Sequence, residues 1–269
     1  MKVKVKGKVV GILLTALLSF GSVASVSASS SPEPSIALDS TVPEGYRVVK
    51  EYDPMDESTK VDMQVEGESL LAETKTLQNS SESIPALDDT EILKNETHLY
   101  RELQNIETGD VVPQYITEMV VAADPFLYSG SNQNSDKSLK LTITLYYHQT
   151  TKNSLAYLGL DKAYWRYDKG SSPNSNITPY LTHTAELLQI GPGINDHGQV
   201  QRKNVSPLAG DLSFGKTYLA EVPSSWIEVL DQGLATEVGL RVNAKFLNQS
   251  TGKIISYGWS LTIKGKSPL

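Results

Sequence analysis

An alternation of apolar and polar residues in residues 236–264 constrains the fold more than any other feature of this sequence. On one side of a turn-like run at 248–252 the apolar positions are Val238, Leu240, Val242, Ala244 and Phe246. On the other side they are Ile255, Tyr257, Trp259, Leu261 and Ile263. A period of two places one set of side chains on each face of a strand. The pattern therefore predicts a β-hairpin with one buried face.

Further segments of the same kind follow residue 111. The candidate strands are 115–122, 139–149, 155–168, 181–190, 216–222 and 225–230. Within 155–168 the apolar residues change from even to odd positions, which predicts a β-bulge near 159–161. Short strands separated by turn-rich loops favour antiparallel sheets. We therefore predict a mainly β fold, an antiparallel β-sandwich of about seven to nine strands, over residues 111–269.

The segment before this domain has a different periodicity. Ile92, Leu99, Leu103 and Ile106 are separated by seven, four and three residues, which is the spacing of one helical face. Capping residues at 88 and 109 fit the two ends of a helix. The spacing predicts one short amphipathic helix or linker over 88–110.

Residues 1–28 have the features of a secretory signal peptide. Four lysines within residues 2–8 precede an apolar run at 9–20, and small residues end at Ala28. The run is shorter than the ~20 residues that a membrane-spanning helix needs, so no stable membrane span is expected after cleavage. The chain contains no cysteine, which excludes disulfides and cysteine-ligated metals. We predict a secreted, extracellular protein, either released into the medium or loosely attached to a cell wall, and the absence of cysteine is typical of a bacterial source.

Charge divides the remaining chain into two parts. Residues 31–110 contain 19 acidic and 6 basic residues, whereas residues 111–269 contain 12 acidic and 14 basic residues. Low hydrophobicity with high net charge predicts a disordered acidic arm over 29–87. Within it, residues 45–52 either pair as a short strand or are incidental apolar residues. No clustered basic surface is apparent, which argues against nucleic acid as a partner.

The glycine-rich loop at 191–198 is the best place for a polar site. It carries Asp196 and His197, and His183 precedes it. These three residues would form a metal or acid–base cluster if the fold brought them together, but their spacing matches no metal motif. We expect no metal and no cofactor. Separation of these side chains by more than about 8 Å would exclude a shared catalytic role.

Aromatic residues suggest a binding surface. The alternation assigns Trp165, Tyr167, Tyr257 and Trp259 to the core, where aromatic rings dominate packing. Tyr146, Tyr164 and Trp226 are the candidates for exposure, and His148 shares a strand face with Tyr146. This face would bind a glycan or a protein. Burial of all four residues, with no other apolar patch exposed, would contradict the hypothesis.

The leading functional hypothesis is an exported, non-enzymatic β-sandwich that binds a protein or glycan surface. One alternative is a secreted hydrolase whose acidic segment is a pro-segment. The other is a self-associating structural protein of the cell surface. The sequence leaves the ligand and the oligomeric state open.

Overall fold

The protein is described from a computed structural model. The structure describes residues 41–70, 74–76, 90–123, 137–170, 176–180, 183–194, 198–205, 212–233 and 235–266. The chain divides into two compact units, Met1–Thr41 and Val42–Leu269, and all the strands belong to the second. The predicted signal peptide at 1–28 lies outside the described residues. Within the described ranges, no helix is both long enough and apolar enough to cross a membrane.

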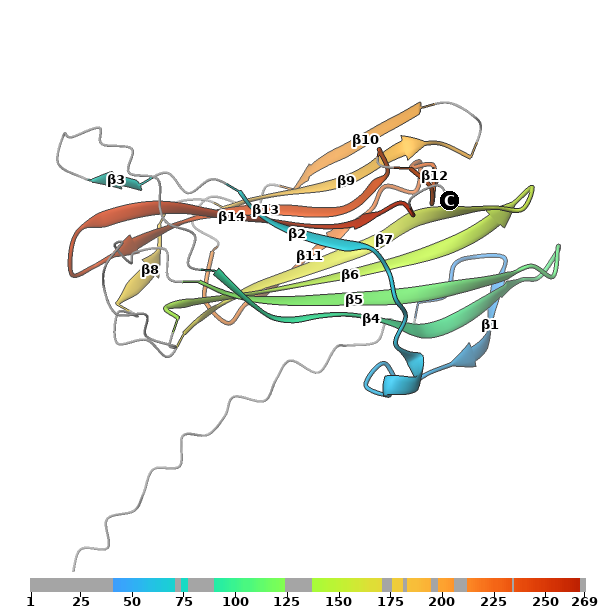
Figure 1. Ribbon diagram of the computed structural model, residues 1–269, viewed down its shortest axis with the longest axis horizontal. Helices are drawn as coiled ribbons and strands as arrows, with labels where there is room; N and C mark the ends of the chain where they lie inside the picture. Colours follow the sequence, from blue (N-terminus) through green and yellow to red (C-terminus); the bar gives the residue numbers. More distant parts are fainter. Residues whose placement is uncertain are drawn as a thin grey trace, which may run out of the picture. The chain divides into compact units, whose positions relative to one another are not determined.

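Two antiparallel sheets pack against each other, which confirms the predicted β-sandwich (Figure 1). Sheet A has the strand order β1-β4-β5-β6-β7-β11, with β12 also paired to β7. Its strands are β1 (Tyr46–Glu51), β4 (Thr90–Asn105), β5 (Val111–Ala123), β6 (Leu139–Lys152), β7 (Leu155–Lys169), β11 (Thr217–Glu221) and β12 (Val229–Leu230).

Sheet B has the strand order β10-β9-β13-β14-β2, with β3 paired to β14 and β8 paired to β13. Its strands are β2 (Val65–Leu70), β3 (Thr74–Thr76), β8 (Ile177–Pro179), β9 (Thr184–Pro192), β10 (Gly198–Val205), β13 (Glu237–Asn248) and β14 (Lys253–Lys264). In the described residues the two sheets together have fourteen strands, whereas seven to nine were predicted for residues 111–269. The difference arises because three strands are very short and four come from the segment before residue 111.

The core lies between the sheets and follows the alternation seen in the sequence. The predicted hairpin is β13–β14, which pairs without interruption from Glu237 opposite Lys264 to Asn248 opposite Lys253. Its inward residues meet those of β6 and β7 in one continuous apolar cluster. Gly252 adopts a φ of +68° in the turn, a conformation that glycine accepts without strain.

The predicted bulge in β7 is also confirmed. Tyr146 pairs with Lys162, but the next residue, Tyr147, pairs with Leu160. Asp161 is therefore the extra residue of β7. The bulge allows Leu160 and Ala163 to reach the core although their numbers differ in parity.

The predicted helix at 88–110 is wrong, because this segment is the long strand β4. β4 pairs with β5 along its length, and its register shifts between Ile92 and Lys94 and again between Leu99 and Arg101. Two bulges interrupt the period of two and leave apolar residues at a spacing that imitates a helix. The imitated face is not buried as a whole, since Ile92 and Ile106 are 49% and 64% exposed whereas Leu103 is 2% exposed.

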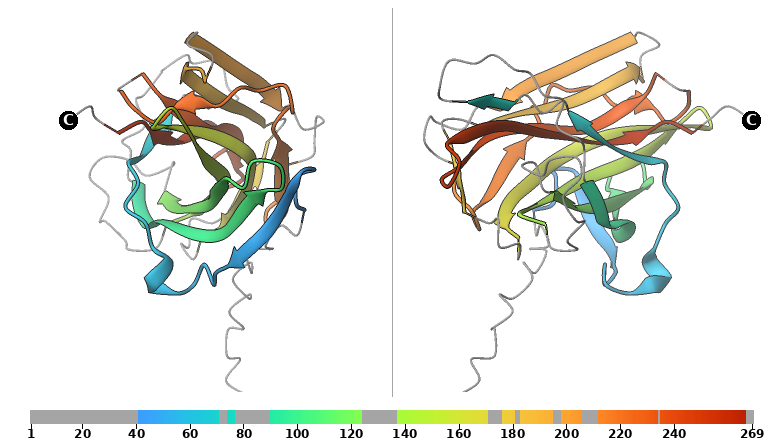
Figure 2. Two further views of the ribbon diagram at one scale, coloured as in Figure 1. Left: turned by 90° about the vertical axis from the view of Figure 1, so that its right-hand side faces the viewer. Right: turned by 60° about the vertical axis from the view of Figure 1, so that its left-hand side comes forward.

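The predicted disordered arm at 29–87 is wrong for its described part. β1 pairs with β4 at the edge of sheet A, and β2 pairs with β14 at the edge of sheet B. The alternative for residues 45–52, a short strand, is confirmed. Backbone pairing supplies the order here, because five of the six β1 residues are exposed and bury little apolar surface. Figure 2 shows the segment between β1 and β2, including the 3-10 turn η1 (Glu57–Thr59), running from one sheet to the other.

Candidate functional site

His148 lies on the face of sheet A that points away from sheet B. Its Nδ1 is 2.7 Å from Asp161 Oδ1, and its Nε2 is 2.9 Å from Glu228 Oε1. Thr150 donates a hydrogen bond to the other oxygen of Glu228. Gly159 pairs with His148 in the sheet, and a Cβ at this position would lie 2.5 Å from the imidazole ring. A glycine is therefore required for the ring to lie against β7. We call Asp161, His148 and Glu228 the histidine clasp.

The two carboxylates reach His148 by different structural routes. Asp161 is the bulge residue of β7, so the bulge directs its side chain toward β6. Glu228 lies in the connection between β11 and β12, residues 222–228. In this connection Ile227 exchanges two hydrogen bonds of 2.6 Å with the Gln201 side chain, and its carbonyl accepts a third, of 2.7 Å, from Gln189. These amides fix the connection to sheet B and so position Glu228 over sheet A.

The clasp holds His148 as a cation. Burial alone would lower the pKa of His148, but the charges and hydrogen bonds of Asp161 and Glu228 outweigh it and raise this pKa to about 10. Burial would raise the pKa of Glu228, but its hydrogen bonds with His148 and Thr150 lower it overall. Both imidazole nitrogens then donate hydrogen bonds, so neither has a lone pair to accept a proton. His148 is not poised as a general base at neutral pH.

A polar row continues from the clasp across sheet A. Gln114 on β5 donates a hydrogen bond of 3.5 Å to Asp161, and Arg101 on β4 donates one of 2.5 Å to Gln114. Arg101 and Gln114 are each 4% exposed. Because both side chains are buried, the hydrogen bonds of this row stabilise sheet A, and the row offers little surface to a ligand.

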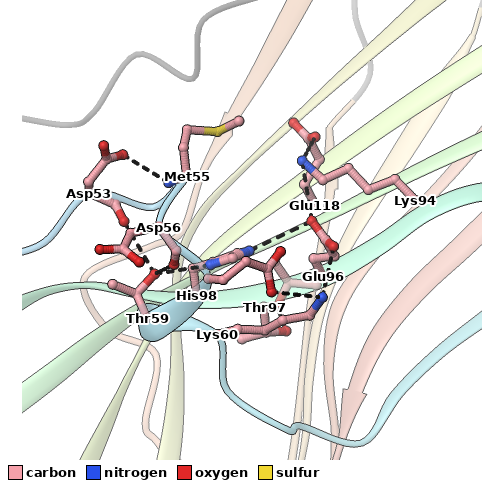
Figure 3. Close-up of polar contacts among 12 residues, drawn as sticks. Asp53, Met55, Asp56, Thr59, Lys60, Lys94, Glu96, Thr97, His98 and Glu118 are labelled. Carbon is pink, nitrogen blue, oxygen red and sulfur yellow. Dashed lines mark hydrogen bonds and ion pairs between the residues drawn. The ribbon is translucent and has the colours of Figure 1, made fainter.

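A second histidine on this face anchors the η1 segment (Figure 3). His98 Nδ1 lies 3.0 Å from the Thr59 hydroxyl, and His98 Nε2 lies 3.7 Å from Glu96. Lys60 and Lys94 both contact Glu96, at 2.9 and 3.6 Å. The hydrogen bond from Lys60 is the main cause of a lowered pKa for Glu96. These contacts hold the chain between β1 and β2 against β4.

The predicted catalytic residues are only partly within the described chain. His183 is 2% exposed, with its ring 4.6 Å from the Tyr218 ring and 6.0 Å from the Trp165 ring. Asp196 and His197 lie outside the described residues, so their proximity to His183 stays a prediction. Among the residues that the structure describes, no three His, Cys, Asp or Glu side chains are arranged to hold a metal ion.

The predicted exposure of Tyr146 is wrong. Tyr146 is 1% exposed, because the rings of Tyr100 and Tyr164 pack against it at 5.5 and 5.7 Å and the Lys162 ammonium lies 4.7 Å from its ring centre.

The other predicted binding residues are half-buried. His148 is half-buried in its clasp, and Trp226 is half-buried against the core. Tyr164 is likewise half-buried, and it pairs with the exposed Leu219 of β11.

Exposed aliphatic residues instead occur on and before β1 and on both sides of the turn between β4 and β5. β1 pairs with the C-terminal part of β4, and the Ile106 amide bonds to the Gly45 carbonyl at 2.9 Å, which brings the segments together (Figure 1). We call this surface the β1 end of sheet A; its exposed residues are Val42, Val48, Val49, Ile106 and Val111.

Comparison with protein-family models, curated proteins and solved structures finds no match to this chain.

The clasp and the β1 end were both missed by sequence reasoning. The phase change in β7 was a signal for Asp161, since a bulge redirects the side chains around it. Glu228 had none, because it is 80 residues away from His148 in the chain.

Proposed function

We propose that this chain is an exported protein whose β-sandwich binds a protein surface through the β1 end of sheet A. The observation that carries the proposal is the presence of exposed aliphatic side chains on these paired segments, of which Ile106 and Val111 are 64% and 51% exposed. Grouped apolar residues on a surface are typical of interaction sites, whereas single ones need no explanation. Exposed charged residues such as Arg47, Glu51 and Glu107 lie on the same segments, and protein interfaces have a polar rim.

A protein partner is favoured over a glycan by the kind of residue exposed. Sugar rings stack on the open faces of aromatic side chains, which must then be accessible. In the described residues, the large hydrophobic side chains that are mostly exposed are all aliphatic or methionine. The aromatic rings Trp165, Tyr167, Tyr257 and Trp259 are at most 3% exposed. The glycan alternative therefore rests on half-buried rings such as Tyr164 and Trp226.

The hydrolase alternative gains no support from the described histidines. His148 is held between two carboxylates in its clasp, and the buried His183 ring lies beside aromatic rings, which argues against a catalytic role for either. Export rests on the sequence of residues 1–28. Its test is the N-terminus of the chain recovered from culture medium, which should be Ser29; a chain retained in the cells with its first residues intact would contradict it.

The binding proposal is tested by placing a charge in the β1 end. Ile106→Asp and Val111→Asp should each reduce the recovery of partner proteins when the purified full chain is used to capture proteins from surface extracts. Leu93→Asp is the matched control, because Leu93 is 53% exposed on β4, the strand that ends just before Ile106, but lies far from the β4–β5 turn. Equal recovery by the two variants and by the control would contradict the proposal. Retention on purified cell-wall glycan that Tyr164→Ala abolishes would support the glycan alternative instead.

A further inference from the structure

Strand β10 forms a free edge of sheet B. It pairs with β9 on one side and has no neighbouring strand among the described residues on the other. Figures 1 and 2 show it at the outer limit of the sheet. In an antiparallel edge strand, about half of the backbone N–H and C=O groups point away from the sheet and remain available to another strand.

This edge lacks the features that protect the other edges. β1 is interrupted by a bulge between Val48 and Lys50, and β11 has only five residues. β2 carries Glu66, which is paired with Lys264. By contrast, β10 keeps one register with β9 over all eight of its residues and contains no proline. Bulges, short length, charge and proline are the usual barriers to pairing between sheet edges.

The two cations of β10 are engaged within their own chain. Arg202 contacts Glu186 at 3.5 Å, and the Lys203 ammonium donates a hydrogen bond of 2.8 Å to the Glu221 carbonyl. Val200 precedes these two cations in β10. It is 71% exposed, the highest value among the exposed large hydrophobic residues described. Apolar surface and open backbone groups therefore coincide on this edge.

From these features we infer that two copies of this chain associate through antiparallel pairing of β10 with β10, which joins their B sheets across a twofold axis. Two residues that pair across antiparallel strands lie on the same face of the sheet. The twofold axis must therefore pass between a residue and the same residue of the partner, so that this residue pairs with its own copy. An axis at Gln201 sets Val200 opposite the partner's Arg202, and Gln199 opposite the partner's Lys203. Gly198 then faces the partner's Asn204. This register opposes no like charges, and a twofold interface closes without further growth.

Substitutions at Val200 test the inference because this side chain is exposed and can change without disturbing the core. Sedimentation velocity of the full chain over a range of concentrations should show a monomer–dimer equilibrium. Val200→Glu places a carboxylate opposite the partner's Arg202, whereas Val200→Lys places a second cation there. The dimer of the Glu variant should be about tenfold tighter than that of the Lys variant, since each cross-strand charge pair contributes a few tenths of a kcal/mol and occurs twice.

Val49→Glu and Val49→Lys are the matched controls on the bulged edge β1, and they should leave the dimer constant unchanged. A wild-type chain that stays monomeric at every concentration would overturn the inference. So would equal dimer constants for the two Val200 variants, or a charge effect of the same size at Val49.

Discussion

Replacement of His148 by glutamine is expected to destabilise the fold by removing the cation of the clasp. Glutamine keeps an amide donor but no charge, so Asp161 and Glu228 are left close together without compensation. Their side chains are 29% and 23% exposed, which makes the site partly rather than fully buried. Removing one partner of a fully buried ion pair costs about 3–5 kcal/mol. Partial solvent access reduces the expected loss for His148→Gln to roughly 2–3 kcal/mol in the free energy of unfolding.

The same substitution should remove a pH-dependent part of the stability. The pKa of His148 is raised from 6.5 to about 10 in the folded chain. Because the folded pKa is the higher one, this contribution is fully present below pH 6.5 and is lost as the pH rises through about 10. The difference between the two pKa values sets an upper limit of about 5 kcal/mol on the contribution.

Urea denaturation of the wild type and of His148→Gln between pH 6 and 10.5 measures both effects. The stability difference between them should be largest near pH 6 and should shrink toward pH 10. Thr150→Val, which removes one hydrogen bond to Glu228 and leaves the three charges in place, is a control that should keep the pH dependence. A difference below about 1 kcal/mol at pH 6, or one that is constant across the range, would refute this account of the clasp.

Three further substitutions in β13 probe sheet B and its contact with the core. Gly239→Ala should prevent folding, because a Cβ would lie 2.1 Å from the Leu261 carbonyl oxygen of β14; a wild-type near-ultraviolet circular dichroism spectrum would contradict this. Leu240→Ala should lower the free energy of unfolding by about 2–5 kcal/mol in urea denaturation, since Leu240 is completely buried, and a loss below 1 kcal/mol would be unexpected. Arg241→Gln removes contacts of 3.5 and 3.7 Å with two glutamates on the outer face of sheet B. It should cost less than about 1 kcal/mol and lose its effect in high salt, and a larger cost that salt does not reduce would contradict this.

The sequence predicted those strands in which the alternation of apolar and polar residues matches the alternation of buried and exposed side chains. The β13–β14 hairpin was predictable because every second residue meets the core, and the β7 bulge because it reverses that phase. β4 was misread because two bulges in one strand produce helix-like spacing, and only pairing with β5 distinguishes the two structures. The edge strand β2 was misread and β1 was left open between two alternatives, because their order comes from backbone hydrogen bonds, which leave no hydrophobic pattern.

The site was less predictable than the fold, because alternation assigns a side chain to a face but does not say what covers that face. Tyr146 was correctly placed away from the sandwich interior, yet neighbouring rings bury it. His148 was placed on the same face, but its partner Glu228 arrives from a distant connection. Contacts of this kind depend on tertiary structure, and no local spacing encodes them.

The two sheets differ in how far their neighbouring strands are separated along the chain, and this difference has a consequence for folding. In sheet A, β4, β5, β6 and β7 are consecutive in both sequence and space, so they can assemble as successive hairpins. In sheet B, Leu70 of β2 pairs with Gly258 of β14, so this edge must close a very long loop. Non-local pairing of this kind is slow. During synthesis, β2 would emerge early and remain without its partner until β14 follows, and sheet A would serve as the scaffold on which sheet B is completed.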